Sequence, residues 1–129
     1  MRLVRACLAL AAALWVTACA TTPEPVRRPL IMISMDGFRA DYLDRGVTPT
    51  LNRLAAEGVR ATGMRPSFPA LTYPNHYTLV TGLRPDHHGL VHNIMEDALS
   101  GQKFTLGDRA QVRNPLWWDG GEPLWVTAG

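Results

Sequence analysis

Apolar and polar positions divide residues 30–81 into two apolar runs and two helical patterns. Residues 30–35 are apolar at every position except Ser34, and the run ends in an Asp-Gly pair at Asp36. An apolar run without alternation that is bounded by a turn is typical of a strand buried on both faces of a parallel sheet. Residues 59–64 are expected to form a second strand.

Two segments have the spacing of helices. Residues 48–58 place a threonine at the N-cap position, a proline at the first helical position and a glycine at the end. One face of this segment is apolar, at Leu51, Leu54 and Ala55. Residues 72–81 are expected to form another helix, which is entered through Pro74 and stopped by Gly82. The order strand, helix, strand, helix predicts an α/β layered domain.

The last part of the sequence holds two weaker patterns. Residues 96–106 contain Ser100-Gly101, which indicates the turn of a hairpin. Residues 123–128 have the start of a further helix, and the sequence stops inside it.

The first nineteen residues have the pattern of an export signal. Two arginines precede the apolar residues 8–16, a stretch too short to span a bilayer, which needs about 20 residues. Residues 1–18 are therefore expected to be a signal peptide. The tripeptide before Cys19 resembles a bacterial lipobox, in which Cys19 would be lipidated and become the new N-terminus. Ordinary signal cleavage after Ala18 fits the same residues.

Residues 19–29 hold prolines, threonines and charges without an apolar period, which predicts a tether. From Cys19 onward 11 basic residues balance 11 acidic ones, so the charge does not favour a nucleic acid polymer as partner. Cys7 would leave with the signal, and no disulfide would remain. The expected location is the cell envelope of a bacterium, periplasm or outer membrane, with the membrane contacted through the lipid on Cys19.

Two positions carry candidate chemistry. Asp36 stands where the first expected strand leaves the sheet, the edge at which sites gather in open α/β folds, and its carboxylate suits a divalent cation. It also fits the simpler role of opening a turn. Thr72 stands at the start of the second expected helix, where free amides favour a phosphate. Its hydroxyl becomes a nucleophile when a base or metal removes the proton, and its simpler role is that of an N-cap.

Residues 36–39 (Asp-Gly-Phe-Arg) and residues 68–82 (beginning Phe-Pro-Ala-Leu-Thr-Tyr-Pro-Asn-His-Tyr) together resemble the type I phosphodiesterase and nucleotide pyrophosphatase family of the alkaline phosphatase superfamily. The resemblance extends over residues 30–129 and includes the Gly-Leu-Val-His-Asn segment at 89–93. It implies an α/β fold, an alkaline-phosphatase-like and mostly parallel sheet with flanking helices. Residues 30–129 would be the N-terminal part of that catalytic domain.

The resemblance also implies an enzyme that hydrolyses phosphodiester or pyrophosphate bonds of small, nucleotide-type substrates with two zinc ions. Asp36 would bind one zinc ion. Thr72 would bind the same ion, attack phosphorus and become transiently esterified. Asn93 would donate a hydrogen bond to a phosphoryl oxygen, and Tyr73 would stack against a nucleotide base.

Other conspicuous side chains are expected to be structural or to lie on the surface. They are His76, His87, His88, His92, Arg39, Asp41, Trp117 and Trp118. The two ligands Asp36 and Thr72 are fewer than the three that a catalytic zinc usually takes from protein. The sequence is therefore expected to be a fragment of a longer enzyme and inactive alone. Two other classes stay open, namely another hydrolase of the superfamily and a non-catalytic envelope lipoprotein. Threonine at position 72 argues against a sulfatase, which needs a modifiable cysteine or serine.

Overall fold

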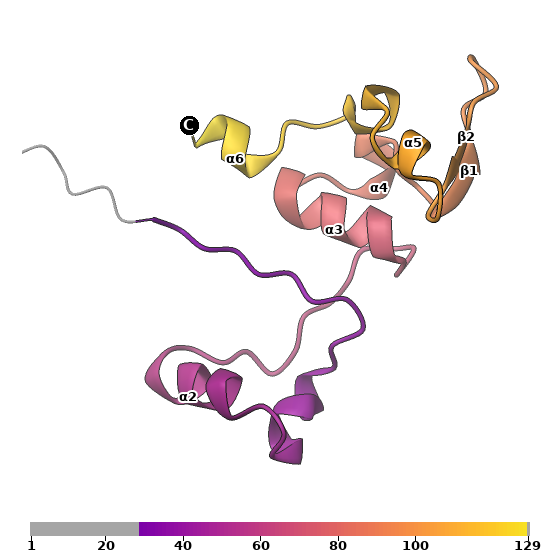
Figure 1. The fold of residues 1–129 in the computed structure, drawn as a ribbon. Coiled ribbons are helices and arrows are strands. Elements are labelled where there is room, and N and C mark those ends of the chain that lie inside the picture. Colours follow the sequence, from indigo (N-terminus) through magenta and orange to yellow (C-terminus); the bar gives the residue numbers. More distant parts are fainter. Residues whose placement is uncertain (1–28, 129) are drawn as a thin grey trace, which may run out of the picture. The chain divides into compact units, whose positions relative to one another are not determined.

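The computed structural model of the chain describes residues 29–128 (Figure 1). The expected signal peptide at 1–18, Cys19 and all but the last residue of the expected tether lie outside the described residues. Contacts divide the chain into the units Met1–Met32 and Ile33–Gly129, and the described helices and strands belong to the second unit. No helix within residues 29–128 is long and apolar enough to cross a bilayer.

Short helices and one hairpin make up the described part of the second unit (Figure 1). In chain order they are η1 (Ala40–Arg45), α2 (Pro49–Glu57), α3 (Thr72–Thr81), α4 (Pro85–His88), β1 (Ile94–Glu96), β2 (Lys103–Thr105), α5 (Arg109–Val112), η2 (Pro115–Trp118) and α6 (Leu124–Thr127).

The two apolar runs do not form the expected strands. Residues 30–35 and 59–64 belong to no helix or strand, and Ile31 and Val59 are 78% and 99% exposed. An apolar run becomes a buried strand when neighbouring strands pair with its backbone. Among residues 29–128 the only paired strands are β1 and β2, which pair with each other. The prediction of these two strands is therefore wrong for this structure.

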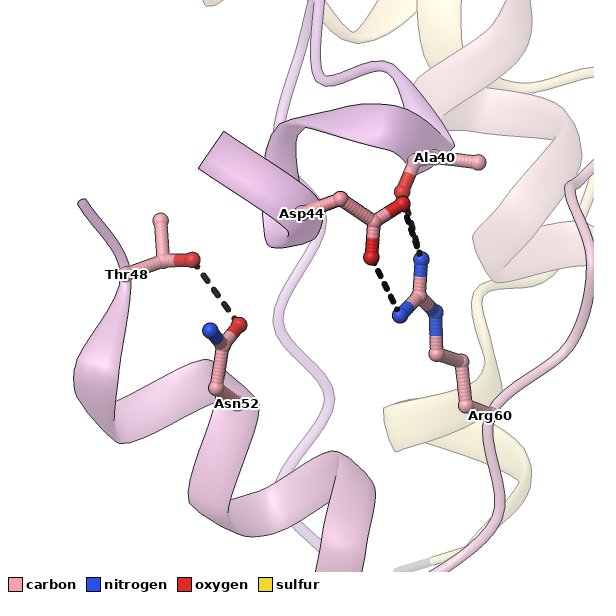
Figure 2. A network of polar contacts seen from close by, with 5 residues as sticks. All are labelled: Ala40, Asp44, Thr48, Asn52 and Arg60. Atoms are coloured by element: carbon pink, nitrogen blue, oxygen red, sulfur yellow. Dashed lines mark hydrogen bonds and ion pairs between the residues drawn. The ribbon is translucent and has the colours of Figure 1, made fainter. Parts of the chain in front are cut away.

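The helix α2 begins and ends where the sequence predicted. Pro49 is its first residue, and Gly58 follows its last turn. Thr48 occupies the N-cap position, but its hydroxyl donates to Asn52 Oδ1 at 3.1 Å rather than accepting from the backbone (Figure 2). The predicted apolar face is not buried, since Leu54 is 52% exposed.

Arg60 ties the chain after α2 back to η1 (Figure 2). Its guanidinium donates to both oxygens of Asp44, at 2.9 and 3.0 Å, and to Ala40 O at 3.2 Å. The bidentate hydrogen bonding of Arg60 lowers the pKa of the Asp44 carboxyl. These contacts fix the loop around α2 by polar pairing in the absence of a buried core there.

The hairpin forms as the sequence predicted. β1 and β2 pair antiparallel, with Met95 opposite Phe104. The turn between them contains Gly101 in the left-handed region, at a φ of +66°. The strand β1 begins two residues before the expected start. The final helix α6 also lies within the predicted residues 123–128.

The hydrophobic core lies under α3, the hairpin and η2. Its buried members are Tyr77, Leu90, Phe104 and Trp117. Side chains partly buried against them are Tyr73, Val80, Met95, Val112 and Trp118. α4 lies beside α3, and α5 lies beside β2 (Figure 1). The core therefore holds one face of α3, the helix that begins at Thr72.

Candidate active site

Thr72 is the first residue of α3, and Leu71 is the N-cap. The N-cap role that the sequence allowed for Thr72 is therefore wrong. The Thr72 side chain instead donates a hydrogen bond from Oγ1 to Asp36 Oδ2, 2.9 Å away. These two residues lie 36 positions apart in the chain, so the contact comes from the fold and not from local sequence.

Asp36 opens a turn and also contacts Thr72. Gly37 follows it at a φ of +64°, a conformation that favours glycine. Of the two roles that the sequence left open for Asp36, the structure shows the turn, and the role of cation ligand stays a prediction. Because the Thr72 hydroxyl uses its hydrogen toward Asp36, both lone pairs of Oγ1 are left for an electrophile or a cation.

The loop before Thr72 is held by the side chain of Asn75. Asn75 Oδ1 accepts from Ser67 N at 2.7 Å, and Nδ2 donates to Pro69 O and Leu71 O, both at 2.9 Å. The peptide bond between Phe68 and Pro69 is cis. One amide side chain therefore supplies an acceptor and two donors to the loop that leads into the helix.

Asn93 reaches the same helix start from the hairpin. Its Oδ1 accepts from Tyr73 N at 3.0 Å, and its backbone carbonyl accepts from Leu106 N at 3.0 Å. Because a backbone N–H can pair only with the oxygen of the amide, the orientation of the Asn93 side chain is fixed. Its Nδ2 has no protein partner within residues 29–128 and can donate to a ligand.

The free amides at the start of α3 are few. The Tyr73 N–H is taken by Asn93, and Pro74 has no N–H. No acceptor among residues 29–128 pairs with the Thr72 N–H. An anion at this helix start therefore meets two kinds of donor, the Thr72 amide and the Asn93 side chain.

Tyr73 lies at the edge of the core. Its ring packs edge-on against Phe104 and Trp118, with centroids 5.2 and 5.9 Å away. It also lines an apolar cavity of about 350 Å³, which Trp118 and Trp125 share. The side chain expected to stack on a base is thus partly engaged by protein aromatics.

The histidines divide into one buried residue and three at the surface or half-buried. His88 is 1% exposed, accepts from Leu90 N at Nδ1 and contacts Pro74 O through Nε2. These bonds fit the neutral tautomer with the proton on Nε2, and burial lowers the pKa of His88. His76 Nδ1 lies 2.7 Å from Ser34 Oγ, and His92 Nδ1 accepts from Ile94 N.

The other side chains expected to be structural have surface or packing roles. Arg39 pairs with Asp41 at 3.0 Å, and both are exposed. Trp117 is buried, and Trp118 packs against the core. No group of three or more His, Cys, Asp or Glu side chains that could hold a metal ion exists within residues 29–128.

Sequence reasoning missed the polar anchors around Thr72, namely Asn75 and the Ser34–His76 pair. Asn75 stands inside the quoted motif, three residues after Thr72. A polar amide one turn into a helix that follows two prolines was a usable signal for a loop anchor. The Ser34–His76 contact, at a separation of 42 residues, left no local signal.

Comparison with known families gives one match over most of the chain. The family described as type I phosphodiesterase / nucleotide pyrophosphatase matches residues 30–129. This range contains Asp36, Thr72, Tyr73 and Asn93.

Curated relatives are similar over the same region. An uncharacterized pyrophosphatase/phosphodiesterase of Schizosaccharomyces pombe is 52% identical over 99 residues, which are 77% of this chain and 20% of the relative. Ectonucleotide pyrophosphatase/phosphodiesterase family member 3 of Rattus norvegicus is 44% identical over 123 residues, covering 88% of this chain and 14% of the relative. The chain thus spans a fifth or less of the length of these relatives.

A solved structure is also similar. It is murine ectonucleotide pyrophosphatase/phosphodiesterase 5, an inactive variant with one threonine replaced by alanine, in complex with AMP. The identity is 36%, the TM-score is 0.71, and the match covers 78% of this chain and 27% of that one. The match confirms the α/β fold class that the sequence predicted.

Proposed function

Because this chain belongs to the type I phosphodiesterase / nucleotide pyrophosphatase family, we propose that its protein hydrolyses phosphodiester or pyrophosphate bonds with Thr72 as nucleophile. The observation that carries the proposal is the 2.9 Å hydrogen bond from Thr72 Oγ1 to Asp36 Oδ2 at the start of α3. A threonine at this place has its hydroxyl oriented by a carboxylate and its backbone amide directed at an incoming anion.

The reaction takes two displacements at phosphorus. Thr72 Oγ1 forms a bond to phosphorus, its proton is passed toward Asp36 or solvent, and the leaving oxygen departs with its bonding electrons. Water then attacks phosphorus, the bond from phosphorus to Oγ1 breaks, the phosphate product leaves with the oxygen of the water, and Oγ1 takes up a proton to restore the hydroxyl. The side-chain amide of Asn93, whose Nδ2 is left for a ligand, donates to a phosphoryl oxygen while negative charge builds up there.

Two zinc ions are the proposed cofactors. Asp36 and Thr72 supply oxygen atoms 2.9 Å apart, which can face a single divalent cation, so the pair fits one side of one metal site. A bound zinc ion lowers the pKa of a coordinated hydroxyl and neutralises charge on phosphoryl oxygens. The pair falls short of the three protein ligands of a catalytic zinc, so residues 29–128 alone are expected to be inactive.

The proposed substrates are small nucleotide-type esters. The similar mouse protein was solved with AMP as an inactive threonine-to-alanine variant, which supports both a nucleotide ligand and the need for a threonine. Tyr73 directly follows Thr72 and is the proposed stacking partner of the base. Its ring is half-buried, so any stacking uses the part that Phe104 and Trp118 leave open.

An exported location is part of the proposal. The rat relative is named an ectonucleotide enzyme, which supports export in general terms. For this chain we propose cleavage of residues 1–18 and lipid attachment at Cys19, on the sequence pattern alone.

The test is an ester preference measured on the whole protein that contains this chain. We expect release of p-nitrophenol from a nucleotide p-nitrophenyl diester, and much slower release from p-nitrophenyl phosphate, a monoester. A protein that prefers the monoester belongs functionally to another branch of the superfamily. A folded protein that cleaves neither ester contradicts the proposed function.

A further inference from the structure

Residues 34–36 are joined to α3 by two side-chain hydrogen bonds that lie next to each other. Thr72 Oγ1 donates to Asp36 Oδ2 at 2.9 Å, and Ser34 Oγ lies 2.7 Å from His76 Nδ1. The first bond belongs to the proposed active site. Ser34 and His76 have no part in the proposed reaction. They form a second hydrogen bond between the same two segments, two residues before Asp36 and one helical turn after Thr72.

The spacing of the two bonds fits the geometry of both segments. Residues two apart in an extended chain lie about 6.6 Å from each other and point to the same side. Residues four apart in an α-helix lie about 6 Å along the axis on the same face. Ser34 and Asp36 are two apart, and Thr72 and His76 are four apart. The distance from Ser34 to Asp36 therefore matches the distance from His76 to Thr72, so both hydrogen bonds can form at once.

These bonds matter because little else holds this stretch in place. Residues 33–35 belong to no helix or strand, and Figure 1 shows them as an open trace that leads toward η1. Ile33 is 73% exposed and Met35 is 47% exposed, so apolar burial does not fix them in the described structure. A single bond at Asp36 would leave the segment free to rotate about it. A second bond two residues away removes that rotation.

We infer that His76 is a positioning residue, which acts through Ser34 to set the register of Asp36 against the Thr72 hydroxyl. A slip of one residue would turn Ser34 and Asp36 away from α3 together, because side chains alternate along an extended chain. The contact uses Nδ1 of the imidazole, which is bonded to Cγ. Asparagine also carries polar atoms on Cγ, so it can replace His76 in this contact in part. The expected effect of His76 on the rate of hydrolysis rests on the proposed function, whereas its effect on the distance between Asp36 and the Thr72 hydroxyl does not.

The test compares variants of the whole protein. We expect Ser34→Ala and His76→Ala each to lower kcat about tenfold, because small misplacements of reacting groups are costly, with KM and Tm unchanged. The double variant should be no worse than either single one, since both break the same contact. Ser34→Thr keeps the hydroxyl and His76→Asn keeps a polar δ atom, so both should stay within about twofold of wild type. His87→Ala is the matched control, because the His87 side chain is exposed and lies 3.8 Å from Asp86, away from Ser34 and Thr72 in the hydrogen bonding of residues 29–128.

The inference would be overturned if the reductions in kcat added in the double variant or if kcat were unchanged in the single variants. A fall in Tm large enough to account for the lower rate would also overturn it. Crystal structures of wild type and Ser34→Ala give a readout that needs no turnover. The inference predicts that the Thr72–Asp36 hydrogen bond is lost in Ser34→Ala, and its retention contradicts the inference. If the wild-type protein shows no diesterase activity, the proposed function fails, and the crystal structures still decide the role of His76.

Discussion

At the scale of single residues, the position of a hydroxyl decides what it can do. Had the Thr72 hydroxyl capped α3, its oxygen would have used one of its two lone pairs to accept from the backbone. Leu71 takes the N-cap position, and Thr72 turns its hydroxyl to Asp36 instead. The arrangement leaves the oxygen lone pairs accessible while the hydrogen is held. A side chain in that state is suited to nucleophilic attack.

Replacement of Thr72 tests this role in the whole protein. Thr72→Ala removes the hydroxyl and should lower kcat/KM by about 10³-fold or more, as loss of a nucleophile does. Thr72→Ser keeps the hydroxyl but loses the methyl group that restricts χ1, so it should retain part of the rate. Steady-state kinetics on a nucleotide p-nitrophenyl ester measures both. Near-normal rates in Thr72→Ala would rule out the nucleophile.

At the scale of elements, α3 is a helix whose start is anchored by polar contacts and whose far face is held by the core. Asn75 fixes the preceding loop, and Asn93 connects the start of α3 to the hairpin. His88 on α4 contacts Pro74 O and Thr78 Oγ1 on α3. Three separate segments therefore meet at the first turns of α3.

Loss of the Asn75 anchor should destabilise the protein. Asn75→Ala leaves the Ser67 N–H without its acceptor and removes a second donor from Pro69 O and Leu71 O, which keep their backbone N–H partners. The unpaired N–H should lower the free energy of unfolding by about 1–3 kcal/mol. Asn52→Ala is the matched control on α2, where the half-buried side chain accepts one hydrogen bond from the Thr48 hydroxyl and none from a backbone N–H within residues 29–128. It should change the free energy of unfolding by less than about 0.5 kcal/mol. Urea unfolding measures both, and equal effects would contradict the anchoring role.

The burial of His88 predicts a pH dependence of stability. Burial lowers the pKa of His88 in the folded protein below its ordinary value, so the unfolded chain takes up a proton first as the pH falls. Stability is then complete above about pH 6.5 and decreases as the pH drops from there toward the lower folded pKa. His88→Gln should remove this slope between pH 7 and 5, and the exposed control His87→Gln should keep it. If stability still decreased between pH 7 and 5 in His88→Gln, the pH dependence would come from other titratable groups.

At the scale of the whole molecule, local and non-local features differ in how well the sequence predicted them. The bounds of α2 and α3 were predictable because proline, threonine and glycine mark them within a few residues. The strands at 30–35 and 59–64 were not, because a strand depends on partners elsewhere, and none pairs with them within residues 29–128. The nearness of Asp36 and Thr72 followed only from the family resemblance. Asn75 was missed because its partners are backbone atoms, which a sequence pattern does not reveal. His88 was expected to be structural or on the surface, and the structure buries it.

Location is also a property of the whole molecule, and it rests on residues outside the described structure. We predict that the mature protein begins at a lipidated Cys19 and is found with the outer membrane. Cys19→Ser should leave the protein unprocessed or soluble, because the thioether to the lipid cannot form. Mass spectrometry of the mature N-terminus is the measurement. An unmodified Cys19, or a start at another residue, would contradict lipidation while leaving export possible.

The central claim is that phosphorus becomes bonded to Thr72 during turnover. The most direct measurement is rapid acid quenching of the whole protein in its first turnover of a nucleotide p-nitrophenyl ester, followed by mass spectrometry of its peptides. The account predicts a nucleotidyl group on Thr72, and none in Thr72→Ala. A nucleotidyl group on another residue would contradict it. An unmodified Thr72 would also contradict it if the same samples show a burst of p-nitrophenol that precedes steady-state release.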